Sequence, residues 1–339
     1  MYAKQKRALL LLGAAVAVLV IVLLAVRGVS RHKAAQSAAD ASSSAGAFTE
    51  AGVKFSSLSY NNGTATLSFA KNDDGRWYWV DDPDFPLEES YLTKLTNTLT
   101  GLRPQQTITD GDPLEDYGLD APAITLSAKT AAGDTLTFAL GNRVAGDSGS
   151  YYLLMNGDKT TVYVVDPSLH TQLSAGIYSM MALPELPVLR ESQIASITVA
   201  GKQQTLLTST VVKSDEKADS SAGNADTVSW RSDGGNVTDN PDAQKLISAV
   251  SALSLSACQD YKPTAKAASL CGFDAPRAVL SVAYTDDEGQ DGTLELSVGG
   301  NTPDGQSCYV RLKDDSTIYS MPAESLSAIL SAADSGLSA

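Results

Sequence analysis

Two short stretches of the sequence hold residue types that could carry nucleophilic catalysis. GDSG at 146–149 places a serine between glycines, and such a serine becomes a nucleophile when a histidine takes its proton. The chain has only two histidines, His32 and His170, and it lacks the base and supporting disulfides that a serine protease needs. Ser214 and Lys217 have the S-x-x-K spacing of penicillin-interacting enzymes, but they lie in a polar segment with no Lys-Thr-Gly after it. No catalytic residue is therefore predicted.

The acidic clusters and cysteines do not form a metal or cofactor motif. The runs 81–84 and 286–288 lack the liganding pattern and twelfth-place Glu of an EF-hand, which favours solvated turns. Cys258, Cys271 and Cys308 include no C-x-x-C pair and no nearby histidine, so a zinc site is not predicted. Their odd number excludes a disulfide scaffold, although one Cys258–Cys271 bridge stays open. No glycine-rich phosphate loop is present, and the prediction is no cofactor.

A charge-free apolar run covers residues 8–26, near the start of the chain. As a helix it would span about 28 Å, close to the hydrocarbon thickness of a bilayer. We expect an N-terminal transmembrane anchor within 1–33. The alternative is a cleaved signal peptide, since an alanine-rich stretch follows.

Basic residues flank this run on both sides, so charge alone does not orient it. The short N-terminus is the simpler part to leave in the cytoplasm, which predicts a single-pass protein with an extracytoplasmic soluble domain. All the acidic residues follow residue 34, whereas six of the 25 Lys and Arg residues precede it. A soluble part more acidic than the whole chain, at −14, disfavours nucleic acid as a partner.

Most of the remaining chain consists of an internal sequence repeat. Residues 34–50 form an alanine- and serine-rich stalk, and two related segments follow at 51–190 and 191–335. Trp79 and Trp230 each precede a lysine by fifteen residues, and a helix with apolar residues at helical spacing begins near that lysine in both copies. Copy two also has a polar insertion at 213–224, which we expect to be disordered.

The pattern of each copy predicts an α+β fold. Strands at 55–60 and 64–70, and at 194–199 and 205–210, are joined by short turns. Two further hairpins and a short closing helix follow in each copy, giving β-β-β-α, a joint, then β-β-β-β-α. Strands joined by short hairpins are antiparallel. We therefore expect two tandem repeats of mainly antiparallel sheet, with helices covering one face.

The joint is the most similar part of the two copies. It reads YGLDAPAITLS from Tyr117 and CGFDAPRAVLS from Cys271. The glycines can take positive φ after a helical turn, the aspartates can accept from backbone N–H groups, and the prolines can precede a strand. Leu119 and Phe273 supply an apolar plug. The structural motif is therefore assigned to these residues, with the two tryptophans: Gly118, Asp120, Pro122, Gly272, Asp274, Pro276, Trp79, Trp230.

The motifs together resemble a known bacterial family. An apolar anchor, Trp, a leucine-rich helix, the Tyr-Gly-Leu-Asp-x-Pro joint, Leu140-Gly141, Tyr151-Tyr152 and a Val-Tyr-Val-Val strand from Val162 are similar to the domain-of-unknown-function family 4340. Copy two departs from the pattern, with Cys271 and Cys308 in place of tyrosines. Members are often encoded beside ABC-type exporters and gliding-motility-type auxiliary proteins. The resemblance implies no catalytic residues, because none are established for the family.

Two functions from different classes remain. The first is a non-enzymatic, membrane-anchored extracytoplasmic module, accessory to an ABC-type transport or cell-envelope complex, whose partner is a permease or an auxiliary protein. The second is an envelope glycan-binding protein or hydrolase that uses carboxylates between the copies. The lack of a catalytic constellation favours the first.

Overall fold

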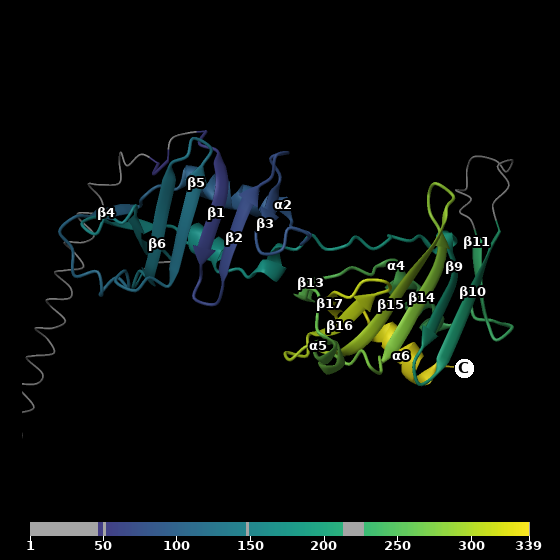
Figure 1. Ribbon diagram of the computed structural model, residues 1–339. Coiled ribbons are helices and arrows are strands. Elements are labelled where there is room, and N and C mark those ends of the chain that lie inside the picture. The colour runs from purple at the N-terminus through teal and green to yellow at the C-terminus, as the bar shows by residue number, and fades with distance from the viewer. Residues whose placement is uncertain (1–46, 50–51, 147–148, 213–226, 339) are drawn as a thin grey trace, which may run out of the picture. The chain divides into compact units, whose positions relative to one another are not determined.

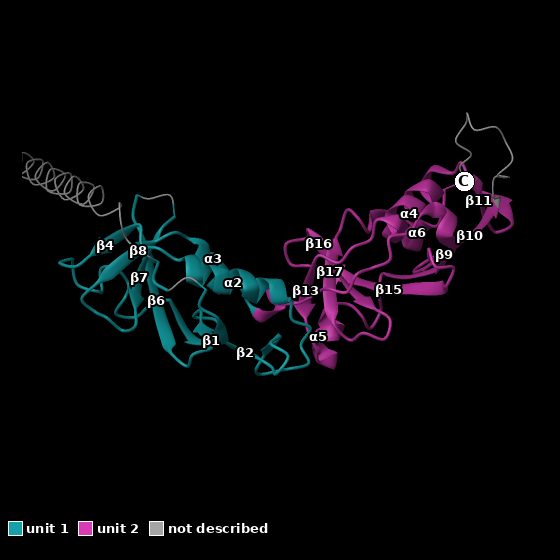
Figure 2. Cartoon of the chain, turned by 90° about the horizontal axis from the view of Figure 1, so that it is seen from above, with its two compact units in different colours: residues 1–176 teal, residues 177–339 magenta. Residues whose placement is uncertain are grey.

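The computed structural model describes residues 47–49, 52–146, 149–212 and 227–338. They form an α+β protein with two large antiparallel sheets, one in each of two compact units (Figures 1 and 2). The division falls between Gly176 and Ile177, whereas the sequence places the repeat boundary after residue 190. The antiparallel α+β class expected from the sequence is confirmed.

The first unit contains an eight-stranded sheet in the order β3-β2-β1-β5-β6-β7-β8-β4. Its strands are β1 (Phe55–Asn61), β2 (Thr66–Lys71), β3 (Trp77–Trp79), β4 (Gln106–Ile108), β5 (Ile124–Thr130), β6 (Thr135–Arg143), β7 (Tyr151–Met155) and β8 (Val162–Val165). Its helices are α2 (Glu89–Gly101) and α3 (Ser168–Leu173).

The second unit contains a nine-stranded sheet in the order β12-β11-β10-β9-β14-β15-β16-β17-β13. Its strands are β9 (Ile194–Ala200), β10 (Gln204–Val212), β11 (Thr227–Ser232), β12 (Gly235–Asn236), β13 (Ala257–Asp260), β14 (Ala278–Thr285), β15 (Asp291–Asn301), β16 (Ser307–Leu312) and β17 (Ile318–Pro322). Its helices are α4 (Pro241–Ser251), α5 (Ala265–Leu270), α6 (Ser327–Ser335) and the short 3-10 turns η1 (Ile177–Met180) and η2 (Glu191–Gln193).

The two strand orders are the same once β12 is set aside, so the duplicated sequence folds into a duplicated sheet. The edge strands β4 and β13 were not expected from the sequence. Each has only three or four residues, too few to show an alternating pattern. β12 is a further addition, a two-residue extension of the hairpin after β11.

Apolar periodicity places the core on one face of each sheet. In β5 every second residue is buried, from Ile124 to Thr130, as expected for a strand with one covered face. The apolar residues at helical spacing in the two longer helices, and one just after each helix, are all buried: Leu92, Leu95, Leu99, Leu102, Ala243, Leu246, Val250, Leu253. Asn240 caps α4, because its side chain accepts from the N–H groups of Asp242 and Ala243, with Pro241 at the first helical position.

In each unit the chain crosses the sheet twice. In the first unit the chain leaves one edge at β3, passes through α2 and reaches the other edge at β4, then returns to the middle at β5. α2 and α3 lie on the face of Tyr60, whose hydroxyl donates to the carbonyl of Ala175 just beyond α3. The return from β4 to β5 passes β8, β7 and β6 on the opposite face, and the joint lies on this return.

Several expectations fall outside the described residues. They are the apolar run 8–26, most of the stalk 34–50, the insertion 213–224, Asp147 and Ser148 of the GDSG stretch, His32, Ser214 and Lys217. In the part of the chain that the structure describes, no helix has the length and apolar character needed to cross a membrane.

The strand register corrects one predicted equivalence. Trp230 pairs with Ser209 in β10, and the position equivalent to Ser209 in β2 is Lys71, which pairs with Trp77. Trp230 is therefore the counterpart of Trp77 and not of Trp79. Trp230 and Trp77 are both buried, at 0% and 7% exposure, whereas Trp79 is only partly buried. The equal spacing of Trp79 and Trp230 from their lysines is therefore misleading, because the segment between the buried tryptophan and the lysine is two residues longer in the first copy.

We expect Trp230→Phe to lower the free energy of unfolding of the second unit by about 1–3 kcal/mol. The indole N–H of Trp230 donates to Oε1 of Glu191 at 2.6 Å, so the change removes this bond and leaves a void. Urea unfolding followed by circular dichroism measures the loss. Trp77→Phe is the matched control, because its indole N–H donates to none of the described residues. Equal losses in the two variants would contradict the role given to the Glu191 bond.

Candidate functional site

The joint has the hydrogen bonds of a Schellman cap in both units. In the first, Gly118 N–H donates to the Glu115 carbonyl at 3.0 Å, and Leu119 N–H reaches back to the Leu114 carbonyl at 2.9 Å. In the second, Gly272 N–H donates to Ser269 at 2.9 Å and Phe273 N–H to Ala268 at 3.1 Å, at the end of α5. The predicted positive φ is confirmed at both glycines, +67° and +88°.

In each copy a second glycine lies against the joint. It is Gly141 of the Leu-Gly pair in the first unit and Gly299 of the Val-Gly pair in the second. The carbonyl of Tyr117 accepts from Asn142 N–H at 2.7 Å, and the carbonyl of Cys271 accepts from Gly300 N–H at 2.8 Å. Both donors lie in an irregularity of the pairing with the next strand, between Leu140 and Arg143 and between Val298 and Asn301. A Cβ atom at Gly141 or Gly299 would overlap the accepting carbonyl oxygen. The two motifs are therefore two sides of one contact.

Tyr117 and Leu119 turn the joint into a cover for the second face of the first sheet. They form an apolar cluster with Leu154 and Val162, and Ala139, Tyr152, Ile108 and Leu114 pack around it. The Tyr117 and Tyr152 rings meet edge to face at 4.7 Å between centroids. The Tyr117 hydroxyl accepts from Asp112 N–H at 3.0 Å. The joint therefore adds a small second core at the β6–β8–β4 end of the sheet.

The remaining motif residues take simpler roles. Pro122 and Pro276 each precede a central strand by two residues, as expected. Asp274 accepts from the hydroxyl of Ser269 and not from a backbone N–H group, so that expectation is wrong for copy two. Asp120 is exposed, and within the described ranges no hydrogen bond to its carboxylate is seen. Leu119 and Phe273 are buried, at 4% and 8% exposure, as the apolar plug requires.

We expect Gly141→Ala to lower the free energy of unfolding of the first unit by about 1–3 kcal/mol, because a methyl group there overlaps the Tyr117 carbonyl. Gly118→Ala should cost at least about 1–2 kcal/mol through its positive φ, and the added Cβ would also overlap the Asn142 side chain. Chemical unfolding of the full chain measures both. Gly101→Ala, at the end of α2 and with no described atom within 4 Å of the added Cβ, is the control and should not lower the stability. A Gly141→Ala chain as stable as the control would refute the interlock.

His170 and the acidic runs have local structural roles. His170 stacks on the Tyr151 ring at 4.0 Å between centroids, and burial lowers its pKa. The acidic run 286–288 forms a turn in which the Asp286 carboxylate accepts from the N–H groups of Glu288 and Gln290. Asp82 likewise accepts from Asp84 N–H. Among the described residues no group of three or more His, Cys, Asp or Glu side chains could hold a metal ion.

All three cysteines are free thiols in the structure, so the Cys258–Cys271 bridge that the sequence left open is not formed there. Burial raises the pKa of Cys258 to about 12, and the carboxylates of Asp260 and Asp315 add to the rise. Burial also raises the pKa of Cys271 and of Cys308. A high pKa leaves little thiolate at neutral pH, which disfavours nucleophilic use of these side chains.

The second unit has a groove of about 1030 Å³ between α4 and α6, which lie side by side over the sheet (Figure 2). Short side chains line most of it, including Ser248 and Ala249 from α4 and Ala328, Ser331 and Ser335 from α6. Lys245 and Glu324 stand at its rim. Helices with short side chains let another backbone approach closely, so the groove has room for an additional segment of polypeptide.

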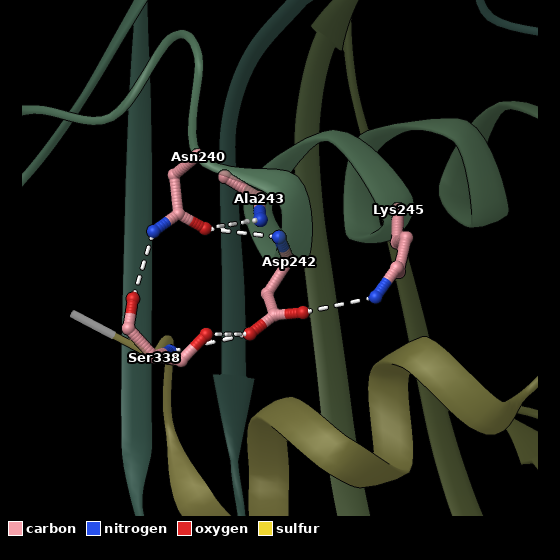
Figure 3. Close-up of polar contacts among 5 residues, drawn as sticks. All are labelled: Asn240, Asp242, Ala243, Lys245 and Ser338. Atoms are coloured by element: carbon pink, nitrogen blue, oxygen red, sulfur yellow. Dashed lines mark hydrogen bonds and ion pairs between the residues drawn. The ribbon is translucent and has the colours of Figure 1, made fainter.

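The chain after α6 lines part of this groove, and its Ser338 contacts the start of α4 (Figure 3). The Asn240 side chain, which caps α4, also donates to the Ser338 carbonyl at 2.8 Å. The Asp242 carboxylate accepts from both the backbone N–H and the hydroxyl of Ser338, and it pairs with Lys245 at 3.2 Å. These interactions hold the pKa of Asp242 below its usual value. The hydrogen bond from the Ser338 hydroxyl contributes most, and those from Lys245 and the Ser338 N–H add to it. The tail thus fixes the start of α4 against α6.

Sequence reasoning did not identify this groove, because its walls come from helices about eighty residues apart. The signal was present in the composition of the helices. SAILSAADS in α6 buries Ile329, Ala332 and Ala333, and it leaves serines on the opposite side. Such a helix has a covered apolar side and an outer side of short side chains.

The family model for a domain of unknown function, DUF4340, matches residues 77–276 and again residues 230–335. The two matches begin at Trp77 and Trp230, the pair that the strand register makes equivalent. No match was found among curated proteins, and none among solved structures.

Proposed function

The chain belongs to the DUF4340 family, and from that premise we propose that it is a non-enzymatic, membrane-anchored module outside the cytoplasm that binds a protein partner. The partner proposed is a component of an ABC-type transport or envelope complex, a permease or an associated auxiliary protein. This choice is supported by the genomic neighbours that the family resemblance implies. The repeated motif supports a non-enzymatic role, because its glycines and apolar residues are used to build the joint.

The observation that carries the proposal is the groove between α4 and α6. Its volume of about 1030 Å³ and its lining of serine and alanine suit a helix or an extended segment of another protein. A groove with short side chains on both walls gives a partner backbone close access without moving large side chains. Lys245 is paired with Asp242, so of these two rim charges the Glu324 carboxylate remains to attract a donor group of a polar segment.

The apolar run 8–26 supports the membrane anchor. An anchor and a folded binding surface on one chain give two attachments to the same membrane complex. The second attachment forms at a raised effective concentration, so a weak contact at the groove is sufficient for association.

We expect Ser248→Arg combined with Ser331→Arg to reduce recovery of the permease by about tenfold, because two long cations fill the groove. The measurement is a detergent pull-down with the tagged full-length chain, and quantitative mass spectrometry identifies the proteins recovered. Asn97→Arg in α2 is the matched control, since Asn97 occupies the same helix position as Ser248 in the other copy. The proposal fails if the unaltered chain recovers no transport or envelope component while a control transporter stays intact.

The orientation has its own test. Protease added to intact spheroplasts should remove the units beyond the stalk, because an extracytoplasmic domain is exposed on that side of the membrane. Immunoblotting against the second unit follows the loss. A domain that stays intact until the membrane is lysed would place the units in the cytoplasm.

A further inference from the structure

The second face of the first sheet is only partly covered, and its open part is hollowed. The joint covers β6 to β4, whereas β2, β1 and β5 present outward side chains to solvent. The hollow has a volume of about 360 Å³ and lies over β1, β5 and β6. The loop after β7 forms one wall, and it is held to β6 by Asn156, whose N–H donates to the Thr137 carbonyl at 2.8 Å and whose side chain accepts from Thr137 N–H at 3.0 Å.

Hydroxyl groups form the floor of this hollow. Ser127 of β5 pairs across the ladder with Ser59 of β1 and with Thr137 of β6, so three hydroxyl residues lie in one row. Neighbouring strands are about 4.8 Å apart, which sets the spacing within the row. Thr125 lies two residues along β5 on the same face. Ser59 bonds to Ser68, but in the described part of the chain the hydroxyls of Ser127, Thr137 and Thr125 have no protein partner.

Charge limits the class of ligand that fits. The strands of the first unit contain no Asp or Glu residue, in a chain with 39 of them. Asp158 in the wall accepts from the N–H and hydroxyl of Thr160 within its own loop. A cation would therefore find no free carboxylate among the residues that line the hollow. Lys159 is the one charged side chain among the described lining residues, and most of the polar lining is hydroxyl, which favours an uncharged ligand rich in hydroxyl groups.

One side of the hollow is apolar. Ala139 and Leu154 line it, and both belong to the cluster packed around Tyr117. Ala139 is the cross-strand partner of Thr125, so this apolar spot adjoins the hydroxyl row. Lys159 from the wall adds an exposed ammonium that can donate to a carbonyl oxygen. The hollow thus offers free hydroxyls, an ammonium that can donate to a carbonyl oxygen and an apolar surface for a methyl group. Together these groups match a sugar that carries an acetamido group.

The second unit has a hollow at the same register, and its chemistry is different. Counting from the two prolines, Glu295 replaces Thr137, Arg311 replaces Leu154 and Val279 replaces Thr125. The Glu295 carboxylate pairs with Lys313, at 2.7 Å between Nζ and Oε1, and Lys313 stands where the first unit has Asn156. An internal ion pair thus occupies the place where the first hollow has a free hydroxyl. In the second unit a carboxylate therefore replaces one hydroxyl of the row, and the charged Arg311 replaces Leu154 of the apolar spot.

We propose that the open face of the first sheet binds an uncharged glycan containing N-acetylated amino sugars. The hydroxyls of Ser127, Thr137 and Thr125 hydrogen-bond the sugar ring, Lys159 donates to the acetamido carbonyl, and the methyl group packs on Ala139 and Leu154. The site does not depend on the partner proposed for the α4–α6 groove, because that groove belongs to the other unit. It uses no carboxylate and carries out no reaction.

The test is isothermal titration calorimetry of the full-length chain in a sugar-free detergent with chitotetraose. Binding is expected for chitotetraose and should be at least about tenfold weaker for cellotetraose, which has the same backbone without acetamido groups. Thr137→Glu with Asn156→Lys copies the ion pair of the second unit and should abolish binding. Ser127→Ala should weaken binding several-fold, whereas Ser281→Ala at the equivalent position of the second unit should have no effect.

The Ser127 side chain is exposed, so thermal unfolding of Ser127→Ala should match that of the unaltered chain. Asn156→Lys removes the acceptor of the Thr137 N–H at a residue with a φ of 51°, so thermal unfolding of the double variant is measured before its binding is compared. The single change at Ser127 keeps the test valid if the double variant is less stable. The proposal is overturned if chitotetraose does not bind the unaltered chain, if cellotetraose binds equally well, or if the Ser127 and Ser281 variants behave alike.

Discussion

Each unit depends on a single backbone contact, the hydrogen bond from a strand N–H to the joint carbonyl across a glycine that has no side chain. The bond itself contributes about 1 kcal/mol. Its larger effect is geometric, because it fixes where the chain returning from the edge strand passes over β6 or β15. That position sets the register of the central strand, β5 or β14, and with it the side chains that each face presents. The helix cap, the irregular part of the strand and the Leu-Gly or Val-Gly pair therefore all contribute to the same contact.

The contact also explains how the two copies diverged. Only the carbonyl of Tyr117 or Cys271 takes part, so the side chain at that position is free to change while the fold persists. In the first unit a tyrosine uses this freedom to build an apolar cluster on the second face. In the second unit the shorter cysteine cannot, and Arg311 instead lies over the Phe273 ring at 4.8 Å. The same backbone therefore carries an apolar surface in one copy and a charged surface in the other.

Much of the fold could be predicted from local patterns, and the failures have physical causes. Alternation in β5 and helical spacing in α2 and α4 identify strands and helices because one face of each is buried. The positive φ at Gly118 was predictable because a glycine after a helical turn has a specific structural use. β4 and β13 were not, since short edge strands are defined by their neighbours. The groove between α4 and α6 depends on how distant helices pack, which neither helix shows alone.

The placement of the thiols has a practical consequence. Every cysteine in the chain lies in the second unit, and Cys258 and Cys308 are buried there with raised pKa values. A thiol reagent reacts with such side chains only when the surrounding structure opens. The rate of alkylation at these two positions therefore reports the opening of the second unit, while the first contributes no signal. Because its cysteines all lie in one unit, the unaltered protein allows the opening of the second unit to be measured separately from that of the first, without an added label.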